Sequence, residues 1–152
     1  MSNTMNSQLN TDEMTSLRLI TGMMIPASAK HGVPGADDEA IFADITRSFG
    51  RDAALVKQAL GHLHRLGGGP FAALDDGQRA AVATDFRKSG GIALMRLSNI
   101  ILQCCYRDDR VMRSLGMEPR PPFPKGFEVE QGDWSMLEKV RARGKIWRDA
   151  PG

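Results

Sequence analysis

The residues best suited to chemistry are two histidines and two cysteines, and their spacing argues against a shared site. His62 and His64 could be metal ligands, but residues two apart on a helix do not face each other. We therefore interpret them as surface histidines on a solvated helix. Cys104 and Cys105 are adjacent, so a disulfide between them would close almost no loop and would strain the chain.

Motifs for cofactors are also missing from the sequence. No CxxC or CxxCH pattern supports zinc or covalent haem, and the run GGGP at 67–70 lacks the Lys-Ser/Thr ending of a phosphate loop. The two cysteines are expected to be reduced and packed as small hydrophobic side chains. His31 lies in a loop rich in Gly and Pro, where it could touch a ligand or a partner, although an ordinary loop histidine is favoured. We expect no catalytic, cofactor-binding or metal-binding residue in this chain.

Composition narrows the classes of protein further. The 152 residues fit one domain, and the net charge of +2 is too close to balance for a nucleic-acid-binding protein. No apolar run approaches the roughly 20 residues that a membrane span needs. Residues 1–14 contain neither a secretory signal nor a twin-arginine motif. We expect a cytoplasmic, soluble protein.

Hydrophobic periodicity predicts an all-α fold, a compact bundle of about five to six helices over residues 11–116 after a disordered segment at 1–10. The first helix is expected to begin at an N-cap on Thr11 and to stop at Pro26. Helices over 37–49, 51–66 and 76–88 follow, the last with Asp75 as its cap and Gln78 completing a capping box. A short helical turn closes the bundle at Gly116. The expected inward residues of the second and third helices are Ile41, Phe42, Ile45 and Phe49, then Leu55, Ala59, Leu63 and Leu66.

The most apolar helix is expected over residues 92–105. Its apolar residues surround nearly the whole circumference, which is typical of a helix in the middle of a bundle; they are Ile92, Leu94, Met95, Leu97, Ile100, Ile101, Leu102, Cys104 and Cys105. Arg96, Asn99 and Gln103 mark its one polar side.

A polar cluster follows this helix at Tyr106–Arg110, and two interpretations of it remain open. In the first, Asp108 or Asp109 begins the next helix and the arginines form local surface ion pairs. In the second, Tyr106, Arg107 and Arg110 contact a partner, because Tyr and Arg are frequent in binding hot spots.

The C-terminal tail (residues 117–152) is the strongest functional signal. Four prolines near its start exclude a helix or a central strand over residues 118–134 and favour a polyproline-like extended segment there, whereas residues 134–149 offer one last helical turn or two. A disordered terminus is normally poor in large apolar residues, yet this one carries Met117, Phe123, Phe127, Trp134 and Trp147. The tail could lie on its own bundle or on another subunit. We favour another subunit, because a bundle of about 115 residues can close its own core.

Three segments resemble the small subunit of bacterial FAD-dependent alcohol and sugar dehydrogenases, the gluconate 2-dehydrogenase subunit 3 type. They are MMIPASAKHGVPGADD, FRKSGGIALMRLSNIILQCCYRDDRVMRSLGMEPRPPFPKGFEV and DWSMLEKVRARGKIWR, and the likeness covers most of residues 14–148. The resemblance implies a large catalytic subunit of the glucose–methanol–choline oxidoreductase type, which carries the FAD. It also implies that the small subunit binds no cofactor and serves folding, stability or assembly. Many members carry a twin-arginine export signal, from which this sequence departs.

Two other hypotheses stay open. The chain could contribute part of a substrate pocket, with His31 or the C-terminal tail reaching the flavin site of the partner. Alternatively, it could be a stand-alone helical adaptor or chaperone whose tail folds back on the bundle.

Overall fold

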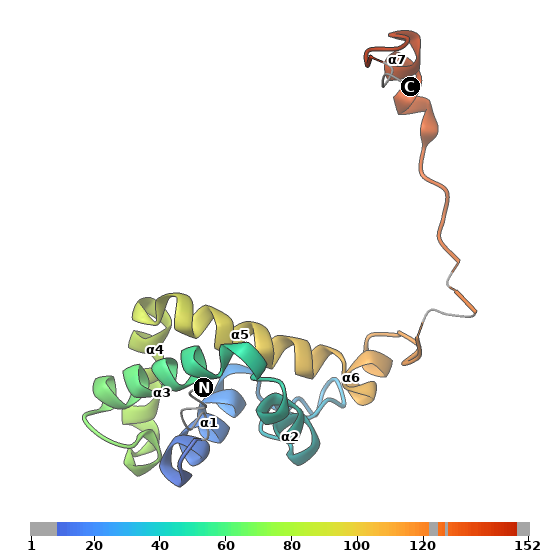
Figure 1. Ribbon diagram of the computed structural model, residues 1–152. Helices are drawn as coiled ribbons and strands as arrows, with labels where there is room; N and C mark the ends of the chain where they lie inside the picture. Colours follow the sequence, from blue (N-terminus) through green and yellow to red (C-terminus); the bar gives the residue numbers. More distant parts are fainter. Residues whose placement is uncertain (1–8, 122–124, 127, 149–152) are drawn as a thin grey trace, which may run out of the picture. The chain divides into compact units, whose positions relative to one another are not determined.

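The computed structural model describes residues 9–121, 125–126 and 128–148. Within these residues the regular structure is helical and no β-strand forms, which confirms the all-α prediction (Figure 1). The chain divides into two units, Met1–Pro119 and Arg120–Gly152. The first unit contains α1 (Thr11–Met24), α2 (Glu39–Arg47), α3 (Ala53–Gly67), α4 (Asp76–Ser89), α5 (Gly91–Tyr106) and α6 (Asp109–Ser114).

The N-cap of α1 is Asn10, so the prediction that Thr11 caps this helix is wrong by one residue. The Asn10 side chain accepts a hydrogen bond from the Glu13 backbone N–H at 2.8 Å. In return the Glu13 carboxylate accepts from the Asn10 backbone N–H at 2.9 Å, which completes a capping box. Residues 1–8 of the segment expected to be disordered lie outside the described residues.

The next two helices lie close to the predicted stretches, with two differences. α2 ends at Arg47, so Phe49, which was expected on its inward face, lies beyond the helix and is half-buried. Asp38 caps α2, and Ile41, Phe42 and Ile45 are buried as expected. In α3 the prediction is partly wrong, because Leu66 is exposed and Leu55 is only half-buried. The buried side of α3 is turned slightly from the predicted one. Its buried residues, at the three- and four-residue intervals of one helix side, are Val56, Ala59, Leu60 and Leu63. Gly68 adopts a left-handed conformation (φ 71°) that ends α3.

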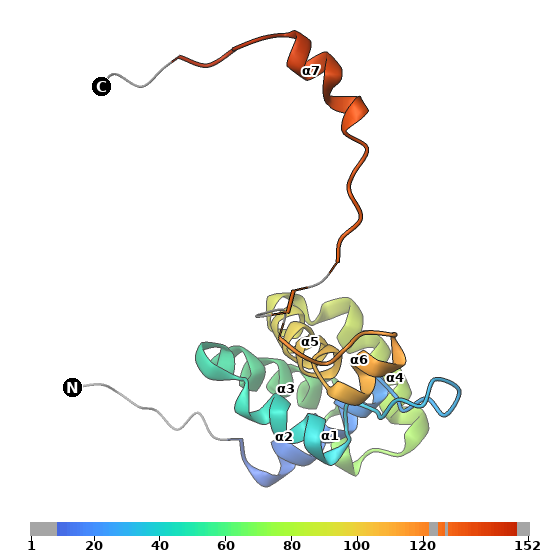
Figure 2. The ribbon, with the colours of Figure 1, turned by 90° about the vertical axis from the view of Figure 1, so that its right-hand side faces the viewer.

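The predicted caps of α4 are confirmed. The Asp75 side chain accepts from the Gln78 backbone N–H at 2.8 Å, and the Gln78 side chain accepts from the Asp75 N–H at 3.1 Å. Gly90 and Gly91 then form a tight corner into α5. Figure 1 shows α5 running beside α3 along the bundle, and α6 lies at the C-terminal end of α5. Figure 2 shows α3 and α5 after a turn of 90°.

The expectation that α5 is enclosed on all sides is wrong. Its inner face packs into the core through Ala93, Leu97, Ile100, Ile101, Cys104 and Cys105. Ile92, Met95 and Leu102 remain 68%, 50% and 42% exposed. The physical reason is the position of α5 at the outside of a small bundle, where it packs against α3 and α2 with one side only.

The second unit has few elements of its own. A 3₁₀ turn at Trp134–Leu137 leads into α7 (Glu138–Ala142), and Asp133 caps this segment through the Ser135 backbone N–H. The described residues between Ser114 and Trp134 form neither helix nor strand.

Candidate partner-binding surface

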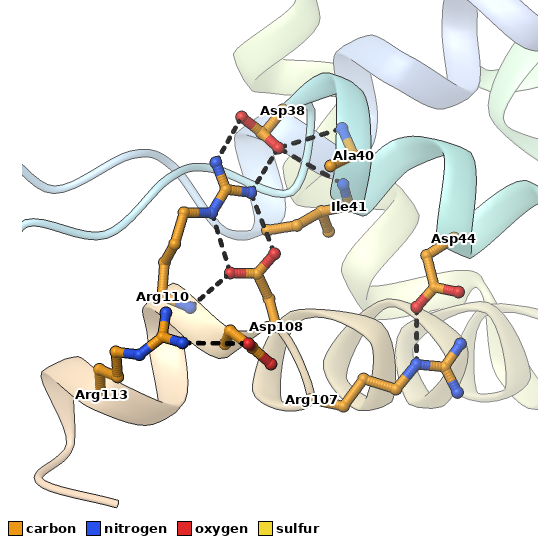
Figure 3. Close-up of polar contacts among 9 residues, drawn as sticks. Asp38, Ala40, Ile41, Asp44, Arg107, Asp108, Arg110 and Arg113 are labelled. Carbon is orange, nitrogen blue, oxygen red and sulfur yellow. Dashed lines mark hydrogen bonds and ion pairs between the residues drawn. The ribbon is translucent and has the colours of Figure 1, made fainter. Parts of the chain in front are cut away.

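Arg107 binds within the bundle, at the C-terminal end of α5. Its Nε donates to Asp44 Oδ2 of α2 at 2.6 Å (Figure 3). A terminal nitrogen of the same guanidinium donates to the Ser48 hydroxyl at 2.7 Å and contacts the Cys104 sulfur at 3.4 Å. The hydrogen bond from Arg107 holds the pKa of Asp44 below its ordinary value. Arg107 therefore joins α5 to α2.

Arg110 connects two helix N-caps. It donates to Asp38 Oδ1 at 2.7 Å and to Asp108 Oδ2 at 3.0 Å, and these two aspartates cap α2 and α6 (Figure 3). The hydrogen bond from Arg110 lowers the pKa of both carboxyl groups, and the backbone N–H groups of each helix start act in the same direction. Asp108 is the N-cap of α6, and Asp109 is its first helical residue.

These contacts agree with the first interpretation of Tyr106–Arg110, in which an aspartate begins the next helix and the arginines form local ion pairs. The side chains of Arg107 and Arg110 still expose 53% and 44% of their surface, and Tyr106 is 58% exposed. Their contact with a partner stays a prediction, and each arginine would have to make it while holding its internal ion pair.

The two thiols lie in the core, as expected. Cys104 and Cys105 are both free and buried. Burial raises the pKa of Cys105 to about 11 and also raises the pKa of Cys104. Both sulfurs are therefore protonated near neutral pH, which makes them poor nucleophiles.

The two histidines point to different helices, but they are half-buried rather than solvated. His62 Nε2 lies 2.8 Å from the Ser89 hydroxyl of α4, and His64 Nε2 lies 2.9 Å from the buried Ser16 hydroxyl of α1. The Ser89 hydroxyl donates to the Asp85 carbonyl at 2.8 Å, so its oxygen accepts from His62. To act as a general base on this serine, His62 would instead have to accept a hydrogen bond from the Ser89 hydroxyl. No group of three or more His, Cys, Asp or Glu within the described residues could hold a metal ion.

Sequence reasoning missed an exposed line of side chains along α5, which we call the α5 stripe: Ile92, Met95, Asn99, Leu102 and Tyr106. Each member is exposed, and the intervals are three, four, three and four residues. These intervals place all five on one side of a helix. The spacing was therefore visible in the sequence, but the apolar residues of the opposite face obscured it.

An apolar groove borders the α5 stripe. It has a volume of about 530 Å³ and lies between α1, α4 and α5. Leu94 and Ser98 of α5 line one side of it, and the methionines Met23 and Met24 of α1 line another. Met side chains adapt to irregular partners.

The predicted anchors of the C-terminal tail are exposed wherever the structure describes them. Met117 is 54% exposed, Trp134 56% and Trp147 67%. Phe123 and Phe127 lie outside the described residues. Every residue from 128 to 148 is exposed, so this stretch buries no core of its own.

Comparison of the chain with protein-family models, with curated proteins and with solved structures finds no match. Among the described residues, none of the helices combines the length and the apolar character that crossing a bilayer requires.

Proposed function

We propose that this chain is the non-catalytic small subunit of a hetero-oligomeric, FAD-dependent oxidoreductase that acts on an alcohol, sugar or glycoside. In this proposal the FAD and the catalytic residues belong to a large subunit of the glucose–methanol–choline type. The small subunit stabilises the large one in a cytoplasmic complex, and its extended C-terminal tail wraps the large subunit. The resemblance of three segments to the gluconate 2-dehydrogenase subunit 3 type supplies the identity of the partner.

The observation that carries the proposal is the exposure of the C-terminal tail. Trp134, Met136, Ile146 and Trp147 expose between 56% and 79% of their surface. Burying a large apolar side chain is worth about 1.5–3 kcal/mol, so an uncovered set of this size favours a binding role. Prolines near the start of the tail reduce the entropy that such a segment loses on binding. A partner surface would then bury these side chains.

Formation of the complex is the first test. Co-expression with the protein encoded beside it, followed by size-exclusion chromatography at the flavin absorbance, should give co-elution with a larger yellow protein. A chain truncated after Gly116 should keep its helical circular dichroism and lose the flavoprotein. A truncated chain that retains the flavoprotein at full strength would refute the wrapping role. A colourless peak at the mass of this chain alone would favour the adaptor hypothesis.

The substrate-pocket alternative has its own test at His31. This residue is exposed, and the loop that carries it projects from the bundle (Figure 2). His31→Ala should leave the turnover of the assembled complex unchanged if the chain is non-catalytic. A loss of turnover in a normally assembled complex would instead place His31 at the flavin site.

A further inference from the structure

The α5 stripe has the spacing of a helix-pairing surface. Alternating intervals of three and four residues are those with which one helix packs its side chains into a second helix, at a crossing angle near +20°. α5 is already folded against α3 and α2, so a partner that binds the stripe need not induce a helix there. Exposed apolar surface rimmed by polar groups is typical of an interaction site.

The surface available to a partner is wider than the stripe. Ser98 lies three residues from Met95 and four from Leu102, so it neighbours both on the helix, and Leu94 lies four residues before Ser98. Both also line the groove of about 530 Å³ that continues to the methionines of α1. An apolar surface of this width suits a helix with several large side chains.

The charges of α5 and, separately, of the C-terminal tail indicate the chemistry of the partner. α5 contains one charged residue, the exposed Arg96, and neither Asp nor Glu. A second copy of α5 would therefore offer no carboxylate to Arg96. The segment 134–148 of the C-terminal tail shows the same bias, with the single acid Glu138 and five basic residues: Lys139, Arg141, Arg143, Lys145 and Arg148. Complementary charge thus favours an acidic partner over self-association.

We infer that the α5 stripe binds an amphipathic helix of the catalytic subunit whose apolar positions repeat every three and four residues and whose flanks carry Asp or Glu. This inference rests on the proposed function and adds to it a contact on the bundle itself. The small subunit then holds its partner at two places, the α5 stripe and the C-terminal tail. Arg96 at the edge of the stripe sets the orientation of the docked helix.

Affinity measurements with the full-length chain and the co-purified flavoprotein test this contact. Met95→Glu and Leu102→Glu should each weaken binding by at least about 10-fold, because each loses the burial of one large apolar side chain. Arg96→Glu should weaken binding most at low salt, where charge repulsion is least screened. Ala54→Glu, at an exposed position of α3, is the matched control and should bind like the wild type. Circular dichroism of each variant checks that the bundle is folded.

Three results would overturn the inference. If both stripe variants bind like the wild type while truncation after Gly116 abolishes binding, the proposed function stands and the stripe has no part in it. If the wild-type chain binds no flavoprotein, the proposed function fails and the inference fails with it. If sedimentation of the chain alone shows a dimer that Met95→Glu dissociates, the stripe belongs to a second copy.

Discussion

The guanidinium of Arg107 lies 2.6 Å from the carboxylate of Asp44, although 63 residues separate them in the chain. The pair joins the end of α5 to α2, and Ser48 at the end of α2 accepts from the same guanidinium. Arg110 holds the other end of α2 through Asp38. Two arginines that follow α5 thus bind both ends of α2 and join it to α5 and α6.

Arg107→Ala should lower the free energy of unfolding by about 1 kcal/mol, because it removes a charged hydrogen-bond donor from Asp44 in a partly exposed site. Urea denaturation followed by circular dichroism measures the loss. Arg47→Ala is the control, since Arg47 lies farther from the same aspartate (3.7 Å) and is 74% exposed. That variant should change stability by less than about 0.5 kcal/mol. Equal losses in the two variants would contradict a specific role for Arg107.

The same ion pairs predict how stability depends on pH. The pKa values of Asp38, Asp44 and Asp108 lie below their ordinary value of 3.8 in the folded protein. Between the folded and unfolded pKa values the unfolded chain binds more protons, so this stabilisation is complete above about pH 5, begins to fall near pH 3.8 and is lost as the pH drops further through the lower folded values. Unfolding curves between pH 6 and pH 3 should show this loss, with a shallower slope for Arg107→Ala. A slope identical in both proteins would contradict the assignment.

Local signals predicted more of the fold than of the candidate surface. The capping box of Asp75 and Gln78 was predictable because its residues are three apart and interact whatever the rest of the chain does. The exposed side of α5 was not, because whether Met95 is covered depends on which distant helices pack beside it. The partner of Arg107 was equally inaccessible, since many aspartates were possible acceptors before the fold placed Asp44 next to it.

The start of α1 gives a prediction with a neighbouring control. Asn10→Ala should destabilise the bundle by about 1 kcal/mol, because the Glu13 backbone N–H loses its acceptor. Thr11→Ala should be close to neutral, since position 11 is the first helical residue rather than the cap. Thermal denaturation of the two variants compares them directly. The reverse order of stabilities would move the cap back to Thr11.

Thiol reactivity tests the burial of the two cysteines. Cys104 and Cys105 are 1% and 3% exposed, and burial raises the pKa of Cys105 to about 11. At pH 8 the folded protein should therefore react with a disulfide reagent far more slowly than the protein unfolded in guanidinium, where both thiols are accessible. The measurement is the absorbance of the released thiolate with time. Rapid reaction of one equivalent in the folded protein would show that a thiol is accessible.

The turn at Gly90 joins α4 to α5 and so sets the direction in which α5, with the α5 stripe, leaves α4. A Cβ added at Gly90 would lie 2.9 Å from the Phe86 carbonyl oxygen and would overlap the Leu94 side chain. The carbonyl belongs to the last turns of α4 and cannot move without shifting the helix, so Gly90→Ala should destabilise the bundle by about 1–3 kcal/mol. Gly69→Ala is the control, because a Cβ there meets no atom within 4 Å. Thermal denaturation should show a lower midpoint for Gly90→Ala and little change for Gly69→Ala. If both variants have the same thermal midpoint as the wild type, the turn at Gly90 tolerates a side chain. The packing of Gly90 then does not set the position of α5.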